Sequence, residues 1–201
     1  MKRAKLRIAS QIGHVETLVN DPGDVRKGIA FIAHPHPLHG GSMDNKVVQC
    51  IAQLCHDEGY VAVRPNFRGV GNSDGVYTGG EGESEDMLAV IAFVRGHYDA
   101  FLPIVLAGFS FGAYVQHRVA QQLSPSKLVL ISPAVNLFHF DQVPDCTTII
   151  HGQDDEIVPF DEARQFACVN QINFHPIAGA GHFYHGKLVE LKTEMLQACH
   201  L

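Results

Sequence analysis

A serine flanked by two glycines is the first feature of this sequence that could do chemistry. The stretch "VLAGFSFGAYV" (105–115) contains Gly108, Ser110 and Gly112 in a G-x-S-x-G pattern. Apolar residues precede the pattern, and sequence of helical character follows it. On such a strand-to-helix turn the serine presents its hydroxyl outward, and the glycines avoid clashes where strand and helix approach. We interpret Ser110 as a nucleophile, which also requires a general base because a serine hydroxyl alone is weakly nucleophilic.

Two loops further along the chain offer that base and a carboxylate to orient it. The segment "TTIIHGQDDEIVPF" carries Asp154, Asp155 and Glu156 after an apolar run, and "HPIAGAGHFYHG" carries His182 and His185. A Ser–His–Asp set uses the histidine to accept the serine proton and the carboxylate to hold the histidine tautomer. The order serine, acid, histidine, each after a predicted strand, favours catalysis over the alternative that Ser110 only occupies a structural turn.

A parallel α/β sheet is the architecture predicted to bring these loops together. Stretches with helical spacing of apolar residues alternate with short runs that are apolar on both faces, as in buried parallel strands. Residues 6–19 are predicted to form two short strands around Gly13, which adds an antiparallel edge. In such sheets the working residues lie at the carboxyl ends of the strands. The predicted buried strands are 29–33, 61–63, 104–107, 128–131 and 147–150.

Length and composition fit one domain spanning residues 1–201. Hydrophobic residues make up 46% of the chain and charged residues 18%, as in ordinary globular domains. No apolar run approaches the roughly 18 residues of a membrane span, and no secretory signal follows the basic start. The five scattered cysteines indicate reduced thiols and a cytoplasmic protein. A net charge of −6 without a basic cluster beyond the first seven residues makes nucleic acid an unsuitable partner.

Two of these segments resemble motifs of the α/β-hydrolases. The segment "HGQDDEIVP" is similar to the acid loop of that family, whose H-G-x-x-D-x-x-V-P pattern implies that Asp155 is the triad acid and Asp154 a solvated neighbour. The segment "GAGHF" resembles the histidine loop and implies that His182 is the base. His185 is then expected on the surface, in the first turn of the last helix. His151 is expected to be a packed or loop-bonding histidine.

The oxyanion of an acyl transfer needs two preorganised N–H donors. One is the backbone amide after the nucleophile, which belongs to Phe111. The second should come from "HPHPLHGGSMDNK" (34–46), where Pro35 and Pro37 have no N–H. The third residue donates in the comparable loop of the family, so the resemblance implies the His36 amide, with Leu38 as the alternative.

Most of the chain resembles small lidless bacterial serine hydrolases that are similar to dienelactone hydrolases. "HPHPLHGGSMDNKVV" and "RPNFRGVGNSDG" carry this resemblance. Dienelactone hydrolases use a cysteine nucleophile and this chain has Ser110, so opening of dienelactones is not assigned. The resemblance implies an α/β-hydrolase fold, no cofactor, and cleavage of a small carboxylic ester or related acyl substrate through an acyl-enzyme. In the glycine-rich loop, Arg68 and Asp74 are expected to bond to backbone.

Other functions are compatible with parts of the pattern. A thioesterase or a cofactor-free perhydrolase would use the same triad, and a ligand-binding module could keep the fold without turnover. His34, His36 and His39 form H-x-H-x-x-H, which is also found in metal sites. A metallohydrolase barrel of that kind needs roughly 250 residues, and no acidic ligand stands at a matching strand end. The sequence leaves the oligomeric state open.

The segment "SPAVNLFHFDQVPDC" (132–146) is where many relatives carry a helical lid. It is short for a folded lid, so we expect an open site and a compact, mostly apolar acyl or aryl substrate. The partner of the protein is then a small molecule, with no membrane involved. Apolar candidates near the site are Phe109, Phe111, Leu137 and Phe138.

Overall fold

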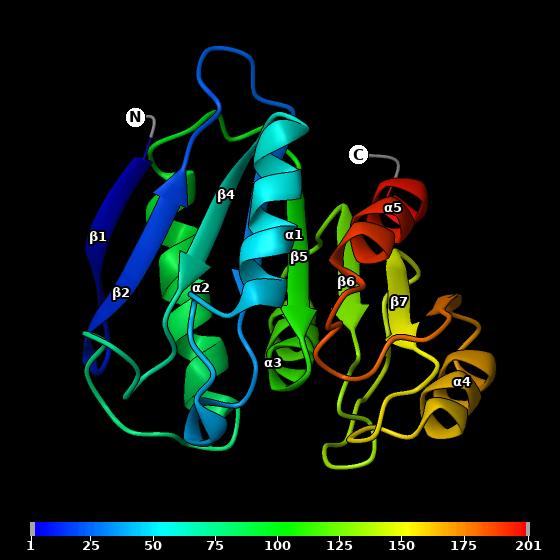
Figure 1. Cartoon of the computed structure of the whole chain (residues 1–201). Coiled ribbons are helices and arrows are strands. Elements are labelled where there is room, and N and C mark those ends of the chain that lie inside the picture. Colours follow the sequence, from blue (N-terminus) through cyan, green and yellow to red (C-terminus); the bar gives the residue numbers. More distant parts are fainter. Residues whose placement is uncertain (1–2, 200–201) are drawn as a thin grey trace.

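A central sheet of eight strands organises the computed structural model, which describes residues 3–199 (Figure 1). The spatial order is β1-β2-β4-β3-β5-β6-β7-β8. β1 pairs antiparallel with β2 and β2 with β4, whereas all the other pairs are parallel. The predicted mostly parallel sheet with an antiparallel edge is therefore confirmed. The strands are β1 (Arg3–Ser10), β2 (Gly13–Asn20), β3 (Gly28–Ala33), β4 (Tyr60–Pro65), β5 (Ile104–Phe109), β6 (Lys127–Ile131), β7 (Thr147–Gly152) and β8 (Asn173–Ile177).

Five α-helices cover both faces of this sheet. The apolar residues of α1 and α5 form one core with one face, and those of α2, α3 and α4 form a second core on the other face. Figure 1 shows α1 and α5 in front of the strands and α2 and α3 behind them. Leu106 faces one core and its neighbours Val105 and Ala107 face the other, which is why β5 is apolar at every position. The helices are α1 (Lys46–Asp57), α2 (Glu81–Arg95), α3 (Phe111–Ala120), α4 (Phe160–Val169) and α5 (Leu188–Cys199).

The start of α1 is fixed by a polar side chain. Asn45 precedes the helix, and its Oδ1 accepts hydrogen bonds from the N–H groups of Val47 and Val48. Such a cap satisfies amides that have no partner within the helix. The N-cap of α1 is therefore Asn45.

The connections that follow the parallel strands place the sequence-predicted site residues at the carboxyl ends of these strands. Ser110 follows β5, Asp155 follows β7, His182 follows β8 and His36 follows β3. Residues 132–146, between β6 and β7, contain neither a helix nor a strand, so no lid is inserted there. Among the helices within residues 3–199, none is both long enough and apolar enough to cross a membrane.

Candidate active site

Ser110 lies on a strained turn between β5 and α3. Its φ of 55° and ψ of −117° are unusual for a residue with a side chain. The backbone approach is close: a Cβ on Gly108 would lie 2.2 Å from the Gly112 carbonyl oxygen, and one on Gly112 would lie 2.4 Å from that of Ala33. The Ser110 N–H donates to the Ile131 carbonyl at 2.8 Å, which ties the turn to β6. The glycines therefore serve the tight packing that the sequence pattern indicates.

A continuous series of hydrogen bonds connects Ser110, His182 and Asp155. His182 Nε2 lies 3.1 Å from Ser110 Oγ, and His182 Nδ1 lies 2.9 and 3.1 Å from the two carboxylate oxygens of Asp155. Because a carboxylate only accepts, Nδ1 carries the proton and Nε2 is free to accept from the serine hydroxyl. The exposed fractions are 8% for Ser110, 3% for His182 and 7% for Asp155. This arrangement can pass the serine proton to the imidazole.

The Asp155 carboxylate is held in its ionised form by several donors. Burial alone would raise its pKa, but hydrogen bonds from His182 and from the amides of Val158 and Ile157 outweigh burial and lower the pKa. His151 Nε2 donates to the Val158 carbonyl at 3.0 Å and lies 3.5 Å from Asp155 Oδ2. Burial lowers the pKa of His151, which favours its neutral form. His151 is the loop-bonding histidine that was predicted.

The neighbouring candidates do not reach the imidazole of His182. Asp154 is exposed, whereas the adjacent Glu156 accepts a hydrogen bond from the His182 backbone amide at 3.2 Å. His185 is also exposed and lies in a turn before α5, one turn earlier than expected. In the same loop, Tyr184 is fully buried and has a φ of 53°. Its hydroxyl lies 3.0 Å from Ser132 Oγ. This contact anchors the histidine loop to the end of β6.

Two backbone N–H groups beside the serine have no acceptor within the part of the chain that the structure describes. They belong to His36 and Phe111, which are the two predicted oxyanion donors. The alternative donor, the Leu38 amide, already donates to His36 Nδ1 at 3.3 Å. His36 Nε2 lies 3.1 Å from the Tyr77 hydroxyl, so both ring nitrogens hold the loop in place. Burial first, and the nearby His39 second, lower the pKa of His36.

The histidines of the H-x-H-x-x-H segment do not point to a common centre. His34 Nδ1 lies 2.7 Å from the Pro35 carbonyl, and His34 Nε2 accepts from the Phe67 N–H at 2.9 Å. Both nitrogens are therefore used, and burial lowers the pKa of His34 to about 4. Within residues 3–199 no three His, Cys, Asp or Glu side chains are grouped as metal ligands. The imidazole of His34 instead joins the loops after β3 and β4.

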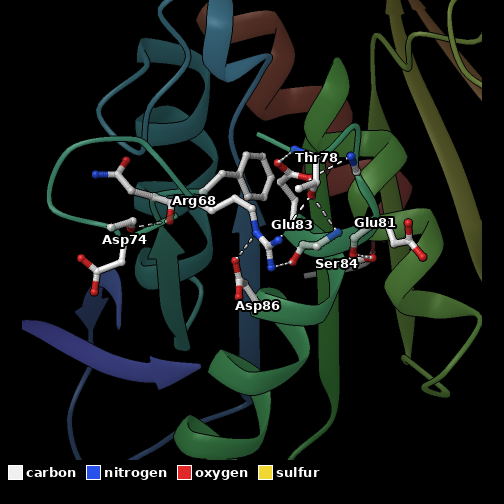
Figure 2. A network of polar contacts seen from close by, with 12 residues as sticks. Arg68, Asp74, Thr78, Glu81, Glu83, Ser84 and Asp86 are labelled. Atoms are coloured by element: carbon white, nitrogen blue, oxygen red, sulfur yellow. Dashed lines mark hydrogen bonds and ion pairs between the residues drawn. The ribbon is translucent and has the colours of Figure 1, made fainter. Parts of the chain in front are cut away.

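The glycine-rich loop after β4 is fixed by a buried ion pair (Figure 2). Arg68 Nε donates to Asp86 at 2.8 Å, and its Nη2 donates to the Gly82 carbonyl at 2.7 Å. Asp74 accepts from the His14 amide at 2.8 Å. The expectation that both residues bond to backbone is thus correct for Asp74 and incomplete for Arg68. The guanidinium reaches α2, whose carboxylate is its main partner.

The same region positions Tyr77 against His36. The Glu83 carboxylate accepts hydrogen bonds from the amides of Thr78 and Gly80, at 2.9 and 2.8 Å. Figure 2 shows Glu83 and Thr78 facing each other at the start of α2. These bonds fix the backbone beside Tyr77, whose ring centroid lies 4.8 Å from that of His36.

A pocket of about 490 Å³ opens beside Ser110 and His182. Aromatic and aliphatic side chains dominate its wall, and none of the described residues that line it is Asp, Glu, Lys or Arg. Three of the four apolar candidates line it, whereas Phe109 is buried behind it with its ring 5.1 Å from that of His182. The other eight lining residues were not predicted to line a pocket, although Ile157 lies within the acid-loop motif and Phe183 within the histidine-loop motif. The apolar lining comprises Phe111, Ala134, Leu137, Phe138, Ile157 and Phe183, and His39 and Asn45 add polar groups.

Comparisons with known proteins agree with this fold. Residues 15–143 match the family model described as X-Pro dipeptidyl-peptidase (S15 family). The matched region contains Ser110 and ends before Asp155 and His182. An uncharacterised protein of Rickettsia prowazekii is 35% identical over 176 residues, which covers 81% of this chain and 74% of the relative.

Solved structures extend the similarity over the whole chain. An α/β serine hydrolase without a lid from Xanthomonas campestris is 33% identical, with a TM-score of 0.95 over 100% of this chain and 94% of its own. An α/β serine hydrolase homologue from Coxiella burnetii is 37% identical, with a TM-score of 0.92 over 98% of this chain and 97% of its own. The expected lidless α/β-hydrolase fold is confirmed.

Proposed function

Because the chain belongs to the S15 family of α/β hydrolases, we propose that it is a hydrolase that cleaves small neutral carboxylic esters through an acyl-enzyme on Ser110. The hydrogen-bonded series from Asp155 through His182 to Ser110 is the observation that carries this proposal. Its position at the wall of an apolar pocket supports an acyl substrate. This chemistry requires no cofactor.

In the first half-reaction, Ser110 Oγ attacks the ester carbonyl carbon while its proton passes to His182 Nε2. The carbonyl oxygen becomes an oxyanion, which the amides of His36 and Phe111 stabilise. The Asp155 carboxylate stabilises the imidazolium without taking its proton. The tetrahedral intermediate then collapses: the bond to the alcohol oxygen breaks, His182 protonates that oxygen, and the acyl group remains on Ser110.

In the second half-reaction, a water molecule replaces the alcohol. His182 Nε2 accepts a proton as the water oxygen attacks the acyl carbon, and the same two amides hold the new oxyanion. The bond to Ser110 Oγ breaks, and the proton returns from His182 to the serine. The products are a carboxylic acid and the free enzyme, with no net consumption of any protein group.

The lining of the pocket favours a neutral ester over the peptide substrates that the family description names. A dipeptidyl-peptidase must accommodate the charged N-terminal amine of its substrate, and a carboxylate usually supplies the partner for such a group. No carboxylate is present among the described residues of this pocket. The rings of Phe111, Phe138 and Phe183 offer surfaces to an apolar acyl or aryl group.

A substrate panel with covalent labelling tests the proposal. We expect p-nitrophenyl acetate and butyrate to be hydrolysed, and a fluorophosphonate to label Ser110 alone. Ser110→Ala should lose both ester hydrolysis and labelling. Ser126→Ala, which removes a hydroxyl bonded to the Ile104 carbonyl, should retain both. Label retained by Ser110→Ala would refute the nucleophile. Faster turnover of glycyl-prolyl p-nitroanilide than of the esters would refute the substrate class but not the triad.

A further inference from the structure

A second depression, which shares no described lining residue with the catalytic pocket, lies beside α1. It measures about 570 Å³ and is bordered by residues of β1, β2, β4, α1 and α5. Four of its lining residues are cations, and none of the described residues that line it is acidic. The chain as a whole carries a net charge of −6, so this concentration of positive charge is a local feature. The four cations are Arg3, Lys46, Arg64 and Lys192.

Arg64 is buried at this depression without an anionic partner. Its exposed fraction is 6%, equal to that of Arg68. Arg68 has the Asp86 carboxylate at 2.8 Å, whereas no carboxylate of the described residues lies within 4.0 Å of the Arg64 guanidinium. Arg64 Nη1 donates to the Met43 carbonyl at 2.9 Å, and its buried Nε has no acceptor among the described residues. A buried cation with so little compensation is unfavourable unless an anion supplies the rest.

The charges around Arg64 do not supply this compensation. Asp44 is the acidic residue that acts on Arg64 electrostatically, and it is exposed on the preceding loop. Burial is the largest effect and lowers the pKa of Arg64; attraction to Asp44 offsets part of it, and a smaller repulsion from Arg3 adds to it. Asn20, at the same depression, has a buried Oδ1 without a donor among the described residues. Of these two groups, an anion would satisfy the Arg64 N–H donor but not the Asn20 carbonyl oxygen.

We propose that this depression binds the phosphate group of a small soluble phosphomonoester, with Arg64 as the buried anchor and Lys46, Lys192 and Arg3 around it. A phosphate dianion suits several converging cations better than a single carboxylate does, and guanidinium groups bind phosphate oxygens with paired N–H donors. The site goes beyond the proposed esterase reaction. Ser110 does not line it, but the start of α1 connects the two places: the cap residue Asn45 lines the catalytic pocket and Lys46, the first residue of α1, lines the depression.

Calorimetric titration of the full-length protein with inorganic phosphate tests the proposal. At constant ionic strength we expect saturable binding, and a rise in the melting temperature relative to equal concentrations of chloride. Lys46→Gln and Lys192→Gln change side chains at the surface of the depression and should each weaken phosphate binding by about tenfold or more. Arg64→Lys keeps the charge and should weaken binding while the fold is retained. Arg164→Gln removes an exposed cation of α4 as the matched control and should leave binding unchanged.

Three results would overturn the site. The first is the absence of saturable phosphate binding to the wild-type protein. The second is equal loss of binding in the Arg164→Gln control, which would indicate only a general effect of net charge. The third is binding to phosphatidate vesicles without binding to phosphate or glycerol 3-phosphate, which would assign the surface to a membrane. Esterase activity is measured in parallel, so that failure of the phosphate site is distinguishable from failure of the catalytic assignment.

Discussion

Acidification from pH 7.5 to pH 5 should destabilise this protein through His34. The imidazole is fully buried, and its pKa falls from 6.5 to about 4 because burial disfavours the charged form. The unfolded chain binds a proton near pH 6.5 and the folded chain does not. The stability contributed by His34 is therefore fully present above pH 6.5, and it is lost progressively as the pH falls toward 4.

The size of this loss follows from the two pKa values. A difference of about 2.5 pKa units corresponds to about 3.4 kcal/mol once the pH is below both values. At pH 5 the folded state is still mostly neutral, and the loss is about 2 kcal/mol relative to pH 7.5. That loss is a large fraction of the stability of a typical domain, about 5–15 kcal/mol. Protonation would also remove the acceptor for the Phe67 amide, which connects the oxyanion loop to the next loop.

Urea unfolding at a series of pH values measures the effect. His34→Gln retains an acceptor for the Phe67 amide and does not titrate, so its free energy of unfolding should change less than that of the wild type, by about 2 kcal/mol, between pH 7.5 and 5. Burial also lowers the pKa values of His117 and His151, but both proteins share these groups and their effect cancels. Carboxylates with lowered pKa values, such as Glu16 with a pKa of about 2, also stabilise the folded state. Their contribution is lost only at more acidic pH. Parallel curves for the two proteins would refute the reasoning.

Three further predictions concern the catalytic site. Asp155→Asn should lower kcat in ester assays by about 10⁴-fold, because the amide would favour the wrong histidine tautomer. Asp154→Asn changes an exposed side chain and should have little effect. The reverse result would identify Asp154 as the triad acid. His36→Ala keeps the backbone N–H donor and should retain kcat within roughly tenfold. His36→Pro deletes the donor and should lower kcat by about 10²–10³-fold. Equal losses of kcat in the two variants would contradict a backbone role for His36. Because residues 132–146 form no lid, the rate should not jump when the substrate aggregates, and short acyl chains should react faster than long ones in a chain-length series.

The sheet and the three central residues were predictable because their signals are local. Strands such as β5 are apolar at every position, and this pattern requires burial on both faces. The strand-to-helix corner at Ser110 combines two glycines within five residues. The acid was less certain from the sequence. Residue types alone allowed Asp154, Asp155 or Glu156, and only the resemblance to the acid loop selected Asp155.

Contacts between distant segments were less predictable from the sequence. Arg68 was expected to bond to backbone, but a long side chain can reach distant partners, and the fold also places the Asp86 carboxylate within its reach. Tyr77 approaches His36 from a loop forty-one positions away in sequence. The cations at the second depression, among them Arg3 and Lys192, come from opposite ends of the chain. Local sequence patterns carry no information on contacts between residues that are far apart in the sequence.

The position of the imidazole beside the edge of the sheet connects activity to local opening of that edge. β8 is the last strand, pairs on one side only with β7, and is partly exposed along most of its length. His182 follows β8, whereas Ser110 follows the central β5. Transient separation of β8 would remove the base from the nucleophile while the strands from β1 to β6 remain paired. Amide hydrogen exchange in β8 therefore reports on the fraction of molecules with a complete site, and a covalent inhibitor that contacts both Ser110 and His182 should slow that exchange.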